Sequence, residues 1–168
     1  MGRFTRILKH RWFDESDARR ALPADALARL ELRVKASERQ HSGEIRICIE
    51  AGLPLSYLWR ELSARERALM LFGKLGVWDT ERNNGVLIYL LLADRTIEIV
   101  ADRGLNSSVT AAQWTAIIEA MQVALRDGQF EAGLGAAVDA VDALLRAHFA
   151  RRPEDPDSNE LPDAPLVI

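Results

Sequence analysis

The sequence predicts an α/β fold, an α/β/α sandwich around a small mixed β-sheet, on three observations. Ile45, Ile47 and Ile49 alternate with other residues, which is the period of a strand with one buried face. Residues 86–92 form an unbroken apolar run, which fits a central strand covered on both sides. Apolar residues at helical spacing precede, separate and follow these strands, so helices can cover both faces of the sheet.

The N-terminal third is predicted to be helical. Residues 4–12 have helical spacing, and Asp14 offers a cap for a short helix that ends at Leu22. Pro23 is tolerated in a first helical turn and begins a third helix. We expect that helix to end at 41–43, with the glycine there as a left-handed terminator.

The centre of the chain predicts the sheet. A strand at 44–50 is followed by a long helix at 56–75, and a second strand covers 86–92. A strand–helix–strand order predicts a parallel pair with a right-handed crossover. A tight turn at 93–96 leads into a third strand at 97–101, so the last two strands are expected to form an antiparallel hairpin.

Two further helices complete the predicted domain. Thr110 and Gln113 have capping-box spacing at the start of the first, and the second is alanine-rich and covers 130–149. We divide the chain into three parts, which are a basic helical segment at 1–22, the main domain at 23–149 and an extended, proline-rich acidic tail at 150–168.

Composition excludes several classes of protein. The net charge of −3 gives no general attraction to nucleic acid, and none is predicted as a partner. Cys48 is the only cysteine, so no disulfide forms within the chain, and its apolar setting indicates a buried thiol. No apolar run approaches the roughly 20 residues that span a membrane. With a poor signal-peptide pattern at the N-terminus, the predicted location is cytoplasmic.

Residues 1–12 leave two interpretations open. Four basic residues alternate with an apolar set at helical spacing, Phe4, Ile7, Leu8 and Trp12. A basic amphipathic helix of this kind could lie on an anionic membrane surface as a peripheral contact. The preferred alternative is a helix that packs on the domain and keeps its charges in water.

Topology brings the polar residues together at one edge of the sheet. The first strand begins at Glu44, the parallel second strand begins after 82–85, and the third runs back to finish at 102–103. The starts of two parallel strands and the end of an antiparallel one share an edge. The candidate residues there are His41, Glu44, Arg82, Asn83, Asn84, Asp102 and Arg103.

This set supports two kinds of chemistry. Glu44 and Asp102 are the candidate ligands of a hard divalent cation, Ca²⁺ or Mg²⁺, although no cofactor is certain. Arg82, Asn83, Asn84, Arg103 and His41 are candidates for binding a small ligand or an anion. The purely structural alternative is an ion pair between Glu44 and Arg103 beside an Asn-Asn-Gly turn. No specific catalytic motif is present.

Several short segments, taken together in order and spacing, resemble the TPM domain. This family includes thylakoid lumen phosphatase-like proteins, photosystem II repair factors and a nematode receptor-associated membrane protein. The resemblance covers roughly residues 25–148. It rests on Gly43–Ile47, Arg82–Ile88, Asp94–Arg95 with Ile97–Ile99 and Gly104–Leu105, the helix start at Thr110–Ile118, and the stretch 128–133.

The resemblance implies an α/β/α sandwich with a shallow acidic cavity at a sheet edge. It also implies links to acid phosphatase activity and to divalent cations in some members. The closing segment 159–163 resembles the tail of a bacterial branch that lacks the signal peptide and the membrane helix. The implied protein is a TPM domain of unestablished activity.

This chain departs from the family pattern at the cavity. Asn83 and Ala111 stand where the family usually has Asp, and Asp102-Arg103 stands where it usually has Gly-Tyr. Fewer carboxylates and an added guanidinium weaken the case for a cation. We therefore expect a binding module with an unknown protein partner or small ligand. The alternatives are a metal-assisted acid phosphatase and a peripheral membrane-associated factor.

Overall fold

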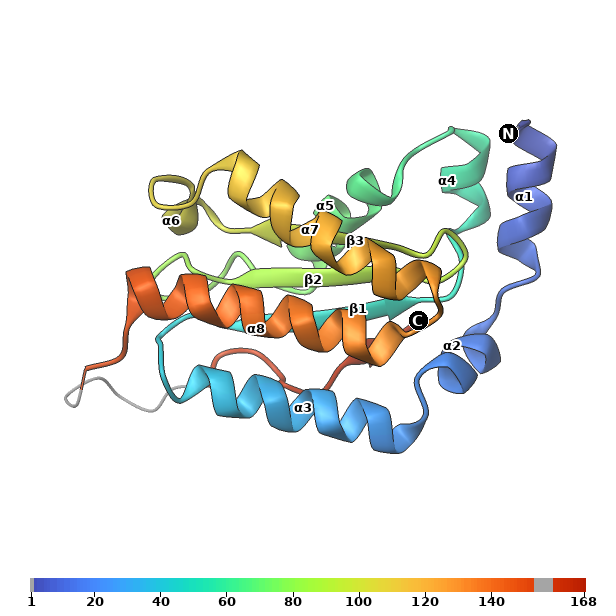
Figure 1. The fold of residues 1–168 in the computed structure, drawn as a ribbon. Coiled ribbons are helices and arrows are strands. Elements are labelled where there is room, and N and C mark those ends of the chain that lie inside the picture. The colour runs from blue at the N-terminus through green and yellow to red at the C-terminus, as the bar shows by residue number, and fades with distance from the viewer. Residues whose placement is uncertain (1, 153–158) are drawn as a thin grey trace.

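The chain folds into helices on both faces of a small open sheet (Figure 1). The computed structural model describes residues 2–152 and 159–168, and in that part of the chain the strand order is β3-β2-β1-β4. The elements are α1 Arg3–Arg11, α2 Glu15–Ala21, α3 Ala24–Glu38, β1 Ile45–Glu50, α4 Leu55–Trp59, α5 Ala64–Lys74, β2 Val86–Leu91, β3 Thr96–Ala101, α6 Arg103–Asn106, α7 Ala111–Arg126, α8 Phe130–Phe149 and β4 Leu166–Val167.

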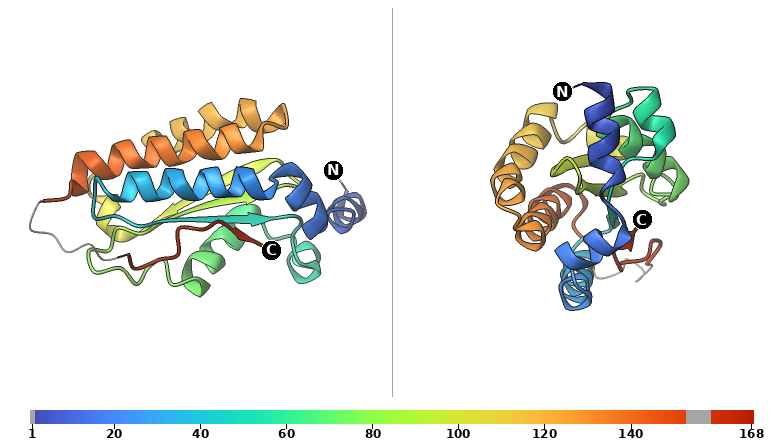
Figure 2. Two further views of the ribbon diagram at one scale, coloured as in Figure 1. Left: turned by 90° about the horizontal axis from the view of Figure 1, so that it is seen from below. Right: turned by 90° about the vertical axis from the view of Figure 1, so that its right-hand side faces the viewer.

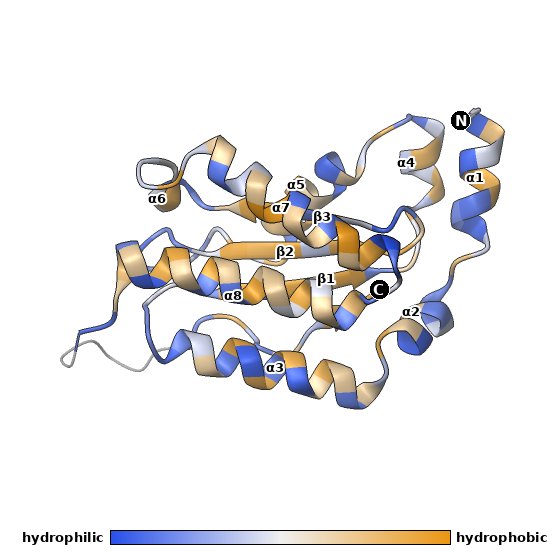
Figure 3. Cartoon of the chain, in the orientation of Figure 1, coloured by the Kyte–Doolittle hydropathy of each residue, from blue (hydrophilic) through white to orange (hydrophobic). Residues whose placement is uncertain are grey.

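The central strand is β2. It runs parallel to β1, with Ile45 opposite Val86, and antiparallel to β3, with Val86 opposite Ala101. The predicted parallel pair and hairpin are therefore confirmed. Every residue of β2 is buried, and the strand is apolar along its length (Figure 3). A continuous apolar run is what a strand covered on both faces requires.

Two apolar layers lie on opposite faces of the sheet. Ile45, Ile47 and Ile49 face a core that α3, α7 and α8 close. Cys48 and the alternate residues of β2 face a second core under α4 and α5. Figure 2 shows these helix layers above and below the sheet. The predicted α/β/α arrangement is confirmed, as is the buried thiol, whose pKa burial raises to about 12.

A buried ion pair ties α5 to the sheet. Arg67 of α5 donates from Nη2 to Oε1 of Glu50 at 2.6 Å and from Nε to Oε2 at 2.9 Å. The hydroxyl of Tyr89 on β2 donates to the same Oε2 at 2.6 Å. Because both carboxylate oxygens have donors, the charge of Glu50 is accommodated inside the protein.

Two predicted helix boundaries are wrong. The helix expected at 56–75 is two helices, since Glu61 adopts a left-handed φ of 56° and Ser63 begins α5 with a capping box to Glu66. The helix α3 ends at Glu38, and Gly43 is no left-handed terminator. Gly43 lies instead against α8, where a Cβ would stand 2.5 Å from a Leu145 methyl carbon.

The C-terminal segment belongs to the sheet, which the sequence did not indicate. Within 159–168, β4 pairs in parallel with β1, and Cys48 lies opposite Leu166. Arg46 Nη1 donates to the carbonyl oxygens of Pro162 at 2.6 Å and Ala164 at 2.5 Å. This segment covers the outer edge of β1, which would otherwise be open to another strand. The stretch of the predicted tail at 153–158 lies outside the described residues.

Helix α1 packs on the domain through its basic side chains and Ile7, while Phe4, Leu8 and Trp12 stay exposed. Arg3 donates to the Trp59 carbonyl oxygen at 2.6 Å, and Arg6 donates to that of Leu62 at 2.7 Å. The expected packing on the domain is therefore present, with Arg3 and Arg11 exposed and Arg6 half-buried. Carbonyls at the end of a helix lack intrahelical donors, so guanidinium groups satisfy them. None of the described helices is both long and apolar enough to cross a bilayer.

The loop between α5 and β2 is fixed by a close backbone contact. A Cβ on Gly85 would lie 2.0 Å from the carbonyl oxygen of Val77, so only glycine fits beneath this loop. The contact holds the loop over the start of β2, where the polar residues of the sheet edge begin.

We predict that Gly85→Ala lowers the free energy of unfolding by at least about 3 kcal/mol, because backbone must move to admit the methyl group. Gly73→Ala is the matched control, since a Cβ there has no neighbour within 4 Å and the residue lies in α5. That control should be neutral or stabilising by up to about 1 kcal/mol. Urea denaturation measures the free energy of unfolding of both variants. Equal changes in the two would contradict the close backbone contact at Gly85.

Candidate functional site

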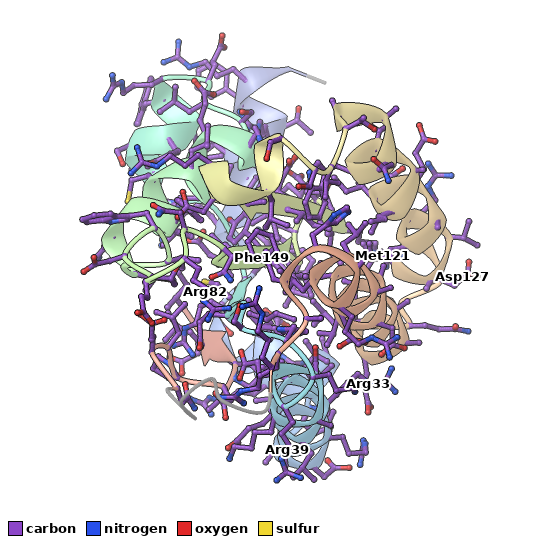
Figure 4. All side chains as sticks on the ribbon, turned by 90° about the vertical axis from the view of Figure 1, so that its left-hand side faces the viewer. Arg33, Arg39, Arg82, Met121, Asp127 and Phe149 are labelled. Carbon is purple, nitrogen blue, oxygen red and sulfur yellow. The ribbon has the colours of Figure 1, made fainter. Side chains whose placement is uncertain are left out.

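One row of residues crosses the sheet at its polar edge. Val86 N donates to Glu44 O at 2.8 Å, and Asp102 N donates to Gly85 O at 2.9 Å. Glu44, Gly85 and Asp102 therefore lie side by side on three strands. Figure 4 looks onto this end of the sheet, with Arg82 near the centre of the view. We call this end, comprising Ser42, Glu44, 82–85 and 102–104, the polar edge.

Asn84 is the fully buried member of the polar edge. Its backbone N–H donates to Thr80 Oγ1 at 3.1 Å, and its Nδ2 donates to Ser42 Oγ at 3.2 Å. Its Oδ1 is buried and has no hydrogen-bond partner among the described residues. One acceptor of the side chain therefore has no hydrogen-bond partner in the described part of the chain.

Asp102 has a second such acceptor. Its Oδ1 accepts a hydrogen bond from Arg103 N at 2.6 Å, as the N-cap of the short helix α6. Its Oδ2 is buried and finds no partner in the described part of the chain. A buried acceptor without a donor costs about 1–3 kcal/mol. Two such atoms in paired segments are unusual, since nearly all buried polar atoms in native proteins have partners.

Two exposed arginines flank these acceptors. Arg103 Nε and Nη2 each lie 3.3 Å from Asn83 Oδ1, and Arg82 Nη1 lies 3.2 Å from Ser42 Oγ. Gly104 makes this packing possible, because a Cβ there would lie 2.4 Å from the Asn83 carbonyl oxygen. The polar edge thus combines guanidinium groups on its surface with acceptor oxygens beneath.

The Glu44 carboxylate is turned to a different partner. It accepts from the backbone N–H of Leu161 in the C-terminal segment at 3.3 Å, and within the described residues it forms no ion pair with Arg103. Glu44 and Asp102 are two strand spacings apart, about 10 Å between backbones. The Val77 carbonyl packed on Gly85 lies over the strand between them.

Asn84 Oδ1 and Asp102 Oδ2 are accordingly the atoms with capacity to bind a hard cation. The described side chains contain no group of three or more His, Cys, Asp or Glu that could hold a metal ion. Any cation here would depend on the amide oxygen, one carboxylate and backbone carbonyls, with Arg103 nearby. Such a donor set has oxygen ligands but little negative charge.

The structure does not place His41 among the contacts of the polar edge. Its Nε2 lies 2.8 Å from Ser37 Oγ on α3 and 3.6 Å from Asp142 Oδ1 on α8. The ring is buried, and burial lowers the pKa of His41, although the Asp142 carboxylate opposes this shift. A neutral imidazole between two helices is a packing arrangement.

A group of carboxylates lies behind the polar edge, where the C-terminal segment crosses β1. Glu38 Oε1 accepts from Ile45 N at 2.9 Å. The pKa of Glu38 is raised to about 9, chiefly by burial, while the Ile45 hydrogen bond opposes the shift and the neighbouring carboxylates of Glu44 and Asp163 add to it. Burial is also the main cause that raises the pKa of Glu44. With a pKa of about 9, Glu38 is protonated at neutral pH.

Sequence reasoning missed three contributors to this region. Ser42 joins Arg82 to Asn84 and also contacts the Phe149 carbonyl oxygen at 3.4 Å. Thr80 orients Asn84 from the preceding loop. The C-terminal segment occupies Glu44. Ser42 directly precedes the Gly-Glu pair of the first strand, which is the only sequence signal that could have indicated it.

Comparison with known proteins identifies the family. The family model described as the TPM domain matches residues 16–144. The chain belongs to the TPM domain family. Among the curated proteins, no sequence matches this chain.

Solved structures agree with this TPM domain. The BA42 protein from the psychrophilic bacterium Bizionia argentinensis, solved by NMR, is 28% identical with a TM-score of 0.75, and the match covers 87% of this chain and 94% of that one. The N-terminal domain of a P. gingivalis protein is 23% identical with a TM-score of 0.56, covering 78% and 83%. The second similarity shows the fold alone.

We predict that Glu38→Gln stabilises the protein at high pH. Because the folded pKa of Glu38 is raised, its contribution to stability is present below about pH 4.5 and is lost as pH rises toward 9. Gln keeps an acceptor for Ile45 N and cannot ionise. The melting temperature should exceed wild type by on the order of a few °C at pH 9 and match it near pH 4.

Glu131→Gln is the control for this pH series. Its pKa is lowered, chiefly by the hydrogen bond from Arg29, so its removal should give no gain at high pH. A difference in melting temperature between Glu38→Gln and wild type that stays constant across the pH range would contradict the buried-acid explanation.

Proposed function

We propose that this TPM domain is a binding module whose polar edge takes a small ligand. The observation that carries the proposal is the pair of buried acceptor atoms without partners, Asn84 Oδ1 and Asp102 Oδ2. The two lie in segments joined by backbone hydrogen bonds, Asp102 N to Gly85 O and Gly104 N to Asn83 O, both 2.9 Å. A ligand that supplies donors or a hard cation would remove the cost of leaving them unpaired.

The surface above these atoms indicates a second requirement for the ligand. Arg82 and Arg103 are both exposed at the rim of the polar edge. Guanidinium groups match carboxylate and phosphate oxygens in geometry and charge. We therefore expect a ligand with an anionic group for the arginines, together with an N–H donor or a Ca²⁺ or Mg²⁺ ion for the oxygens. A protein partner and a cytoplasmic location stay predictions.

The phosphatase alternative has weaker support. Metal-assisted hydrolysis by the expected pair needs Glu44 and Asp102 on one ion. Glu44 instead accepts from Leu161 N, and burial raises its pKa, which disfavours the anionic ligand form. Hard cations are held by several oxygen ligands, of which carboxylates contribute the charge. The geometry therefore favours binding over hydrolysis.

The binding proposal is tested by NMR titration of the full chain with CaCl₂, with MgCl₂ and with inorganic phosphate. We expect saturable shifts in the backbone amides of 83–85 and 102–104 in at least one titration. Asp102→Asn should weaken cation binding about tenfold or more, because it removes the carboxylate charge while Asn still caps α6.

Asp139→Asn serves as the matched control for that titration. Asp139 is an exposed carboxylate on α8 that pairs with Arg33 at 2.6 Å, far in sequence from the polar edge. It tests whether loss of any negative charge has the same effect. Absence of saturable shifts at the polar edge in all three titrations, or equal effects of the two variants, would refute the proposal.

For the alternative, we predict no turnover of a chromogenic phosphate ester above the protein-free rate, with Mg²⁺ or Ca²⁺, from acid to neutral pH. Glu44 accepts a hydrogen bond from Leu161 N, so the metal-assisted route has weak support for its second carboxylate. Turnover that Asp102→Ala abolishes, in a variant that melts as wild type does, would establish the phosphatase instead.

A further inference from the structure

Helix α1 presents an uncovered apolar face at the end of the molecule opposite the polar edge (Figure 1). Phe4, Leu8 and Trp12 are spaced by four residues and are 79%, 63% and 79% exposed. Side chains at this spacing share one face of a helix. Leu8, Trp12 and Phe13 also line a shallow apolar groove with Thr5. Side chains of this size are seldom left so exposed together in a stripe.

The orientation of α1 is fixed by the contacts on its other face. His10 is buried, and its Nδ1 accepts from Leu53 N at 3.1 Å. Lys9 pairs with Asp94 at 2.8 Å, and Arg3 and Arg6 donate to carbonyls of the α4 region. Because these bonds hold the polar face against the domain, the apolar stripe is directed away from it.

Helix α4 carries exposed apolar side chains of its own next to α1. It packs beside α1, and Leu55 and Trp59 are about half exposed there. Arg3 lies over the Trp59 ring at 4.6 Å from its centroid. We call the surface of Phe4, Leu8, Trp12, Phe13, Leu55 and Trp59 the α1/α4 face. It combines aromatic rings with aliphatic side chains.

Basic residues accompany the apolar side chains of α1 along the helix. Residues 1–12 contain four Lys or Arg and no acid, so the remaining chain carries a net charge of −7, given a total of −3. Arg3 and Arg6 bond to neutral carbonyls, which leave their charge intact, and Arg11 is exposed. An apolar, aromatic and basic surface on an acidic protein complements an anionic bilayer.

We propose that the α1/α4 face docks on the surface of an anionic lipid bilayer, with Phe4, Leu8 and Trp12 inserted at the headgroup level. Aromatic rings favour this interfacial depth, and the exposed Arg3 and Arg11 would lie near anionic headgroups. A second copy of the chain fits less well. A two-fold contact would bring the same basic residues of α1 against each other.

The test is co-sedimentation of the full chain with phosphatidylcholine vesicles that contain about one third phosphatidylglycerol. We expect binding that weakens in high salt and on pure phosphatidylcholine, because screening and loss of anionic headgroups remove the charge attraction. Leu8→Ser/Trp12→Ser should lower the partition coefficient about tenfold or more, because both side chains are removed from the lipid.

The matched control is Leu69→Ser/Val123→Ser, which removes two exposed apolar side chains from α5 and α7 and should bind as wild type does. Circular dichroism melts establish that both double variants are folded. Wild type that does not sediment with anionic vesicles, or Leu8→Ser/Trp12→Ser that sediments like wild type, overturns the proposal. The proposal is also overturned if wild type is a dimer in sedimentation velocity and does not bind vesicles, while Leu8→Ser/Trp12→Ser is a monomer.

Discussion

The pairing of β2 with β1 on one side and β3 on the other is the interaction on which the rest of the structure depends. It places Glu44, Gly85 and Asp102 in one row and determines which loops meet at each end of the sheet. Gly85 makes this arrangement possible, because the Val77 carbonyl occupies the space of a side chain there. The loop that results covers the centre of the row and separates its two carboxylates.

This separation changes the chemistry that the edge can support. Had Glu44 and Asp102 converged, a hard cation between two carboxylates would be a natural expectation. With Glu44 engaged by the C-terminal segment, the oxygens without partners are a buried amide oxygen and one buried carboxylate oxygen, with two guanidinium groups on the surface nearby. Position 83 also has less negative charge than the family resemblance implies, because Asn stands there in place of Asp. Arg103 lies against the Asn83 amide oxygen. Both features support the proposal of a mixed-charge ligand over that of a metal held by two carboxylates.

Most of the fold follows from local patterns in the sequence. The alternation at Ile45–Ile49, the apolar run of β2 and the tight turn at 93–96 each report a short-range property, and the strands they predict are present. The split between α4 and α5 depends on the left-handed backbone of Glu61. Glutamate seldom adopts this conformation, so the sequence contains no sign of it. The strand β4 depends on contacts with β1 more than 100 residues away, so no local pattern could have shown it.

The candidate site, too, could be predicted from the sequence only in part. Topology alone brought the segments 82–85 and 102–104 to one edge, but it could not show which atoms already have partners. The partner of Glu44 comes from a tail that composition marked as extended, and Ser42 has no distinctive neighbours. At the other end, helical periodicity identified the apolar stripe of α1 correctly. It could not show that helix-end carbonyls of the α4 region would draw the basic face inward and leave the stripe exposed.

The most direct test of the central claim is the electron density at the polar edge in crystals grown with Mg²⁺ and phosphate. The account predicts an ordered ion or ligand atom within hydrogen-bonding or coordination distance of Asn84 Oδ1 or Asp102 Oδ2, with an anion near Arg82 or Arg103. Density that shows both oxygens accepting hydrogen bonds from the protein's own side chains, and no bound species, would contradict it.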